Sequence, residues 1–386
     1  MTAKKTRAAD AADTTRLPQQ LLGGLSPATF MRRYWQKKPL LIRQAIPGFS
    51  PLLDRAALFD LSGREEVESR LIVHSEKGWQ LKHGPFGRRQ LPALSRPRWT
   101  LLVQGVDLHV NAVHELMQRF RFVPDARLDD LMISWASDGG GVGPHFDSYD
   151  VFLLQAQGQR RWRIGRQKDL SLQPDVPLKI LSNFEPEEEH VLNPGDMLYL
   201  PPKWAHDGVA VGGDCMTYSV GFRVPQRGGL AAELVQRMAD AFEDSTLYRD
   251  PGQPATATPA AMPAALADFA AEGLRKLVED RASLACALGE VMTEPKPRVW
   301  FDEASAPWTP GALRLDRRTR MMYDERHIFI NGESFRAAGA DARLMHQLAD
   351  QRVLGARAVQ RASTDAQLLL QEWHEAGWLH RLDARA

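Results

Sequence analysis

The sequence predicts an α+β protein in which a β-sandwich or barrel precedes a helical part, and three observations support this prediction. Between Leu128 and Val224 the apolar runs are short, rich in β-branched and aromatic residues, and separated by turn residues, which is typical of such sheets. After Pro225 the apolar residues recur at helical spacing. Nearer the C-terminus, Asn331-Gly332 separates two strand-like runs, as in a β-hairpin.

The composition is that of an ordinary soluble protein of 386 residues, which is enough for two or three domains. With 49 basic and 48 acidic side chains, its global charge selects neither nucleic acid nor a membrane as partner. Cys215 and Cys286 are isolated, so we expect no disulfide framework and a reducing cytoplasm. No apolar run approaches the length of a membrane span, and residues 1–16, which lack a signal-peptide core, are expected to form a disordered tail.

The part of the chain before the strand-rich region should lead into the sheet with both helices and strands. Ser26 followed by Pro27 predicts the start of a helix, and "PLLIR" (39–43) predicts a strand behind it. Short apolar runs then alternate with Gly and Pro, and "HVNAVHELMQRF" (109–120) has the spacing of a helix. We therefore expect an α+β segment up to about residue 125.

The strand-rich region and the two regions behind it differ in the period of their apolar residues. "DVFLLQAQG" and "RRWRIG" are predicted to be two strands that flank a turn at Gly158. Helical runs joined by a Pro- and Ala-rich link follow from residue 226. From about residue 299, the predicted hairpin and two helical runs suggest a small winged-helix-like domain.

His145 and Asp147, in "GPHFDSYD", have the i, i+2 spacing that puts two side chains on the same side of a strand. The Fe(II) site of non-haem oxygenases takes two histidines and one carboxylate, so a further histidine is needed. The best candidate is His206 in "NPGDMLYLPPKWAHDG", just past a predicted strand, because a barrel brings distant strands together. The alternative is a chance H-x-D and an ordinary loop histidine, and the second segment favours the metal site.

Arg160 lies thirteen residues beyond Asp147, on the strand predicted after Gly158. An iron site of this type usually takes 2-oxoglutarate, whose outer carboxylate needs a cation, and the planar fork of arginine suits that task. Strand alternation puts Arg161 and Arg163 on the opposite face from Arg160. A solvated basic edge is the alternative, but the position relative to the metal residues favours an inward Arg160.

The segments "DGGGVGPHFDSYDVFLLQAQGQRRWRIG", "PGDMLYLPPKWAHDG" and "TYSVGFRVP", preceded by "FMRRYWQKKPLLIR", resemble the bacterial JmjC-type ribosomal oxygenases of the cupin superfamily. The resemblance is strong over residues 20–225 and weaker beyond. It implies a double-stranded β-helix (jelly-roll) catalytic domain at 17–225, a helical dimerisation region at 226–298 and a winged-helix-like domain at 299–386.

The resemblance also implies Fe(II)- and 2-oxoglutarate-dependent hydroxylation of a ribosomal protein with O2. In the most similar members the target is the β-carbon of an arginine in large-subunit protein L sixteen. The site residues that match the family's motifs are the metal ligands His145, Asp147 and His206, the cosubstrate clamp Arg160, and the pocket residues Thr217 and Ser219.

Asp138, at the head of "DGGGVGPH", is a candidate to receive the substrate guanidinium, because a buried cation needs a paired carboxylate. The alternative is a turn aspartate ahead of three glycines. Hydroxylation of a histidine or another residue in a different protein, and a non-catalytic cupin-like binding protein, remain open as functions.

We expect a cytoplasmic homodimer that acts on a ribosomal protein, free or in its ribosome-assembly form, with no membrane partner. The predicted last helix, "AQLLLQEWHEAGWLHRL", has few basic residues. Direct binding of nucleic acid by the C-terminal domain is therefore not expected.

Overall fold

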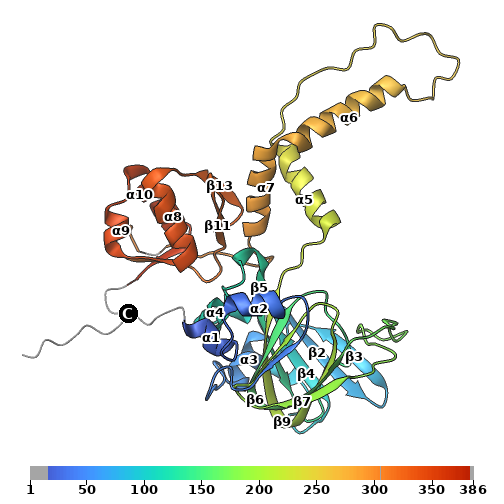
Figure 1. The fold of residues 1–386 in the computed structure, drawn as a ribbon, viewed down its shortest axis with the longest axis vertical. Helices are drawn as coiled ribbons and strands as arrows, with labels where there is room; N and C mark the ends of the chain where they lie inside the picture. Colours follow the sequence, from blue (N-terminus) through green and yellow to red (C-terminus); the bar gives the residue numbers. More distant parts are fainter. Residues whose placement is uncertain (1–15, 305, 383–386) are drawn as a thin grey trace, which may run out of the picture. The chain divides into compact units, whose positions relative to one another are not determined.

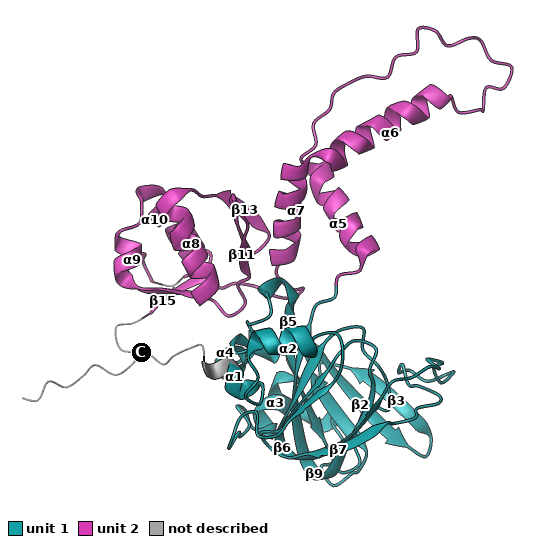
Figure 2. Ribbon diagram, viewed as in Figure 1, with its two compact units in different colours: residues 1–224 teal, residues 225–386 magenta. Residues whose placement is uncertain are grey.

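A computed structural model describes residues 16–304 and 306–382, and the chain forms two compact units that join between Val224 and Pro225 (Figures 1 and 2). The predicted disordered tail lies outside the described residues, except for Arg16, which begins the first helix. In the part of the chain that the structure describes, no helix is both long and apolar enough to cross a membrane.

The first unit contains one sheet, four α-helices and three short 3-10 helices. The α-helices are α1 (Arg16–Leu21), α2 (Pro27–Arg33), α3 (Arg55–Leu61) and α4 (Asn111–Gln118), and the 3-10 helices are η1 (Arg88–Gln90), η2 (Val106–Leu108) and η3 (Asp125–Arg127). The strands are β1 (Leu40–Ile42), β2 (Ser69–Ser75), β3 (Gly78–His83), β4 (Trp99–Val103), β5 (Leu128–Ala136), β6 (Val151–Gly165), β7 (Glu188–Leu192), β8 (Met197–Leu200) and β9 (Ala205–Phe222).

The predicted elements of the N-terminal part are confirmed. The Ser26 side chain accepts a hydrogen bond from the backbone N–H of Thr29 (3.2 Å), and Pro27 is the first residue of α2. "PLLIR" contains β1, which pairs antiparallel with β8, and the helical spacing of 109–120 corresponds to α4.

The nine strands form a single antiparallel sheet in the order β1-β8-β6-β9-β5-β4-β2-β3, with β7 paired to β6. β6 and β9 are long, 15 and 18 residues, and pair along most of their length. The first part of β6 also pairs with β8, and its second part with β7. The two long strands are therefore shared by both halves of a curled sheet (Figure 1), which confirms the predicted strand-rich fold.

The predicted turn at Gly158 is wrong, because β6 continues through it. Gly158 has φ +64°, and the pairing of β6 with β9 shifts register on both sides of Gln157, which makes this a bulge and not a turn. A Cβ on Gly158 would lie 3.0 Å from the carbonyl oxygen of Asp214 on β9. Arg160 therefore lies on the strand that begins four residues after Asp147, with no turn between its two parts.

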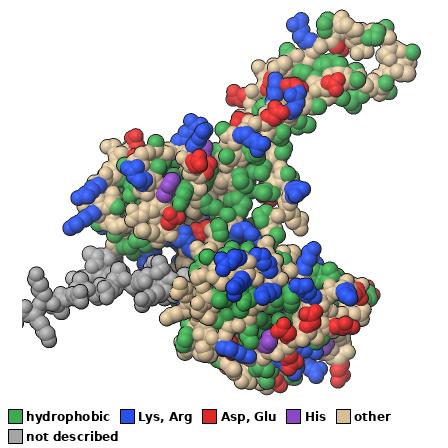
Figure 3. All heavy atoms as spheres, in the orientation of Figure 1, with side chains coloured by type: hydrophobic (Ala, Val, Ile, Leu, Met, Phe, Trp, Pro, Cys, Tyr) green, Lys and Arg blue, Asp and Glu red, His purple; other side chains and the backbone are tan. Residues whose placement is uncertain are grey.

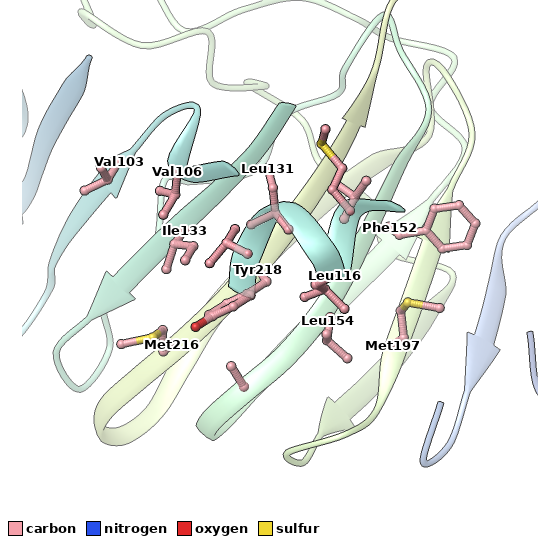
Figure 4. Close-up of a cluster of buried hydrophobic side chains, with 14 of the residues drawn as sticks. Val103, Val106, Leu116, Leu131, Ile133, Phe152, Leu154, Met197, Met216 and Tyr218 are labelled. Carbon is pink, nitrogen blue, oxygen red and sulfur yellow. The ribbon is translucent and has the colours of Figure 1, made fainter. Parts of the chain in front are cut away.

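The largest hydrophobic core lies on one face of this sheet. Figure 4 shows its side chains from the neighbouring strands β4, β5, β9, β6 and β8, with Leu116 of α4 among them. Leu131, Phe152, Met197 and Tyr218 are all fully buried there. Because successive residues of a strand alternate between faces, the opposite face of β6 and β9 remains for a cavity.

The second unit contains three helices, two small sheets and three further helices. The helices are α5 (Arg227–Asp240), α6 (Ala264–Glu279), α7 (Arg281–Thr293), α8 (Gly339–Gln351), α9 (Ala356–Gln360) and α10 (Thr364–Glu375). The sheets have the orders β14-β10-β15 and β11-β12-β13, from the strands β10 (Leu313–Leu315), β11 (Met321–Tyr323), β12 (His327–Ile330), β13 (Glu333–Arg336), β14 (Val353–Leu354) and β15 (Leu379–Arg381).

The predicted hairpin is confirmed, because Asn331 (φ +48°) and Gly332 (φ +90°) connect β12 to β13. Helix α7 packs closely on this hairpin: a Cβ on Gly289 would lie 2.3 Å from the ring of Phe329. The side chain of Thr293 also accepts a hydrogen bond from the backbone N–H of Gly332 (3.2 Å). Helix α7 and the hairpin therefore share packing, and the predicted division at residue 298 stays a prediction.

Candidate metal and cosubstrate site

His145 and His206 are held together by their backbones. They form an isolated antiparallel bridge, in which each N–H donates to the other residue's carbonyl at 3.0 and 2.8 Å. His206 lies past β8, as predicted, but it is the second residue of the next strand, β9. His145 and Asp147 precede β6 in an extended segment, where the carbonyl of Asp147 accepts a hydrogen bond from Lys203 N (2.7 Å).

Both imidazole rings are oriented by hydrogen bonds from Nδ1. Nδ1 of His145 lies 2.8 Å from the carbonyl of Gly143, and Nδ1 of His206 lies 3.0 Å from the carbonyl of Trp204. A carbonyl only accepts, so each Nδ1 carries a proton, which leaves Nε2 of each ring as the nitrogen that can bind a metal. This support of a histidine from behind is the usual arrangement around a bound metal.

The ligand atoms of His145, Asp147 and His206, called the triad below, all lie within 4.8 Å of one another. Nε2 of His206 is 3.6 Å from the nearer carboxylate oxygen of Asp147. Burial, followed by the positive charge that His145 would carry, lowers the pKa of His206 to about 4, so this ring is neutral at neutral pH. Two imidazole nitrogens and one carboxylate fit the donor set of a non-haem iron site.

The triad lines a cavity of about 500 Å³ on the face of the sheet opposite the main core. The size suits a small organic ligand together with one substrate side chain. Besides the triad, its wall includes Arg70, Asp129, Asp130, Ser134, Tyr149, Arg160, Trp162 and Ser219.

Arg160 projects into this cavity, as strand alternation predicts, and is 5% exposed. Its Nη1 lies 3.5 Å from the hydroxyl of Ser134, whereas its buried Nε and Nη2 have no hydrogen-bond partner among the described residues. Leaving donors of a buried guanidinium unpaired is costly, so the site is complementary to an anion in the cavity. Arg163, on the other face, pairs with Asp207 (2.5 Å).

The two predicted pocket residues on β9 differ in their position. Ser219 lines the cavity. Thr217 is not among the residues that line it, and its hydroxyl donates a hydrogen bond to the side chain of Gln155 (3.0 Å) within the sheet. The structure thus brings Ser219, but not Thr217, to the triad and Arg160.

Asp138 does not lie in the cavity wall. Its exposed carboxylate accepts a hydrogen bond from the backbone N–H of Gly212 (2.8 Å), and its own carbonyl accepts one from Arg98 N (2.8 Å). This position fits the alternative given above, a turn aspartate ahead of three glycines, and not a contact with the guanidinium of the substrate. Besides Asp147 of the triad, the acids that line the cavity are Asp129 and Asp130.

The sequence reasoning missed Asp130 and Tyr149. Asp130 is 4% exposed, and one of its carboxylate oxygens accepts hydrogen bonds from Gln104 Nε2 (2.9 Å) and Gly105 N (3.0 Å). Partial burial, followed by the charges of Asp147 and Asp130, raises the pKa of Tyr149, so its hydroxyl stays protonated. The sequence does contain a signal for Asp130. It is an acid in the otherwise apolar strand β5, four residues before Ser134, and this even spacing puts both side chains on the same face of the strand.

Comparison with known proteins gives two family matches. A JmjC domain matches residues 115–230, and a ROXA-like winged helix matches residues 276–380. These matches cover the triad, Arg160 and the C-terminal sheets with their helices.

Among curated proteins, the chain is 35% identical to "Ribosomal protein uL16 3-hydroxylase" of Escherichia coli over 74% of this chain and 76% of that protein. It is 37% identical to "Probable ribosomal oxygenase" of Haemophilus influenzae over 53% of this chain and 52% of that protein. More distant, at 27% identity over 48% of this chain and 31% of that protein, is an Aedes aegypti protein named "Bifunctional lysine-specific demethylase and histidyl-hydroxylase NO66".

Among solved structures, E. coli YcfD matches with a TM-score of 0.81 and 30% identity, over 92% of this chain and 98% of that one. A second structure, described as YcfD "in complex with Cobalt and 2-oxoglutarate", matches with a TM-score of 0.79 over the same shares. The similarity extends through both units. The chain therefore belongs to the JmjC-domain ribosomal oxygenases.

Proposed function

We propose that the protein is an Fe(II)- and 2-oxoglutarate-dependent hydroxylase that acts on the β-carbon of an arginine in a large-subunit ribosomal protein like L sixteen. The observation that carries the proposal is a single cavity with a two-histidine, one-carboxylate group and a buried arginine with unpaired donors. The relatives named for uL16 hydroxylation and for 2-oxoglutarate binding support it.

In this proposal the triad holds iron and Arg160 holds the cosubstrate. Iron with 2-oxoglutarate and O2 supplies the oxidising chemistry that inserts one oxygen atom into a C–H bond, with succinate and CO2 as the other products. The His145–His206 backbone bridge keeps two ligands at a fixed separation. Arg160 orients the outer carboxylate of 2-oxoglutarate through its free Nε and Nη2, with Ser219 nearby in the wall.

The acidic part of the wall supports an arginine as the substrate residue. A guanidinium enters a cavity favourably only where a carboxylate receives it, and Asp130 is a buried carboxylate in this wall. The protonated hydroxyl of Tyr149 adds a donor beside Asp147. We assign Asp130 and Tyr149 to the substrate side chain, in place of Asp138.

We further propose that residues 226–298 form a dimerisation region and that the enzyme is a homodimer. The buried apolar residues of this region are few: Met238, Leu277 and Ala287 form its cluster. By contrast, α5–α7 and the adjoining link leave large apolar side chains exposed: Val235, Phe242, Leu266, Phe269, Leu274, Val278 and Leu288. Figure 3 shows hydrophobic side chains lying among charged ones on the surface of the molecule. A second copy of the chain would bury this surface.

We further propose that the enzyme acts in the cytoplasm, where it would meet its ribosomal-protein substrate free or during ribosome assembly. Residues 17–225 are the proposed catalytic domain and 299–386 the proposed winged-helix-like domain.

The test is to incubate the purified protein with Fe(II), 2-oxoglutarate, O2 and separated ribosomal proteins, and to measure succinate and protein mass. We expect succinate release together with the gain of one oxygen atom on one large-subunit protein, located on an arginine by fragmentation. Oxygen on a histidine would reassign the substrate. No turnover with any ribosomal protein would contradict the proposed function and favour a cupin-like binding protein.

A further inference from the structure

Trp162 contacts both the proposed cosubstrate clamp and a proposed metal ligand. The guanidinium carbon of Arg160 lies 5.7 Å from the centre of its ring, and the His206 ring lies 5.8 Å away on the other strand. Trp162 is 5% exposed and lines the cavity. One rigid side chain thus connects two groups that must act on the same small molecule.

Arg160 has little other support in the cavity. Its single side-chain hydrogen bond among the described residues, to Ser134, is long at 3.5 Å, and Nε and Nη2 have no partner. An arginine side chain loses about 2 kcal/mol of rotamer entropy when it is fixed. Packing against Trp162, with the cation attracted to the ring, is therefore the contact that keeps Arg160 oriented before a ligand arrives.

The space for the Trp162 ring is provided by Gly208, its pairing partner on β9. A Cβ on Gly208 would lie 2.5 Å from Cζ3 and 2.6 Å from Cη2 of Trp162. Contacting carbons are normally about 3.5–4 Å apart. Gly208 has no left-handed φ, so it is the close approach of the ring, and not the backbone, that requires glycine here.

We propose that Trp162 is a positioning residue, seated on Gly208, that fixes Arg160 and His206 relative to each other. The inference rests on the proposed function, because it assigns these two residues to the cosubstrate and the metal. Arg160 and His206 lie on different strands, and the pairing of β6 with β9 puts Arg160 opposite Ala210 and His206 opposite Ile164. Because the indole ring contacts both side chains, it keeps the distance between Arg160 and His206 constant although the arginine side chain is flexible by itself.

The experiment measures the Kd of 2-oxoglutarate by calorimetric titration, with Mn(II) in place of iron and without O2, so that the readout does not need turnover. Gly208→Ala forces the ring to move and should weaken binding about tenfold, the equivalent of one lost cation–π contact and its alignment. Gly213→Ala is the matched control, because it lies on the same strand with nothing within 4 Å of the new Cβ. It should leave the Kd unchanged.

The double variant Gly208→Ala with Trp162→Leu separates positioning from a general effect on β9. We expect it to bind no more weakly than Trp162→Leu alone, because the new methyl group then fills vacated space. Losses that multiply, or a Trp162→Leu variant with unaltered affinity, would overturn the inference, and the latter also decides the matter if Gly208→Ala does not fold. Absence of 2-oxoglutarate binding by the unaltered protein would instead contradict the proposed function, and the inference with it.

Discussion

Replacing Arg160 with methionine should separate ligand affinity from stability. Arg160 is 5% exposed, and its guanidinium offers Nε and Nη2, which have no partner among the described residues, to a carboxylate in the cavity. Truncating one partner of a buried, hydrogen-bonded charge pair costs about 2–5 kcal/mol, which raises the Kd of 2-oxoglutarate between about 30-fold and several thousand-fold. The free energy of unfolding of the ligand-free protein should change little, because the substitution loses only one long hydrogen bond and the packing on Trp162, and it relieves two unpaired buried donors.

The assay combines titration of 2-oxoglutarate with thermal unfolding in the absence of ligand. Arg161→Met is the matched control, since it removes the same group from the other face of β6 and should leave the affinity intact. Arg160→Lys keeps the charge but loses the fork, so it should recover only part of the affinity. An unchanged Kd in Arg160→Met would refute the assignment of the clamp.

Three further predictions concern the triad, the substrate and the C-terminal unit. His145→Ala should abolish succinate formation without altering the circular dichroism spectrum, and retained turnover would remove His145 from the site. Asp130→Asn should raise the KM for the arginine-containing substrate at least about tenfold, through loss of a charged partner, while the Kd of 2-oxoglutarate stays the same; equal effects on both would contradict its role. Burial alone would raise the pKa of Asp316, but hydrogen bonds from His380 and Arg318 outweigh it and hold the pKa well below its usual range. This carboxylate therefore stabilises the fold above about pH 4 and loses that contribution as the pH falls further. Asp316→Asn should accordingly lower the melting temperature at pH 7 and lower it much less at pH 2. A difference in melting temperature that does not depend on pH would contradict the ion-pair account.

The parts of the fold that the sequence predicted correctly depend on local chemistry. Ser26 with Pro27 starts a helix and Asn331-Gly332 turns a hairpin because capping and left-handed φ values act within a few residues. Gly158 shows the limit of this reasoning. Glycine at positive φ serves a turn or a bulge equally well, and the choice is made by pairing with β9, which is more than forty residues away in the chain.

The candidate site shows the same division. The spacing of His145, Asp147 and Arg160 along the chain was enough to predict them as site residues, because strand alternation is a local rule. Which acid faces the cavity was not accessible in this way, because Asp138 and Asp130 differ in their long-range partners, Gly212 and Gln104. The glycine run pointed to Asp138, which does not line the cavity.

The measurement that tests the central claim most directly is the visible absorption of the protein loaded with Fe(II) when 2-oxoglutarate is added without O2. If the triad holds iron and the keto acid chelates it there, the complex would give a charge-transfer band. We predict that the band appears with the unaltered protein, requires much more 2-oxoglutarate in Arg160→Met, and is absent in His145→Ala. No band with the unaltered protein, or an equal band in all three, would contradict the assignment of this cavity as an iron and 2-oxoglutarate centre.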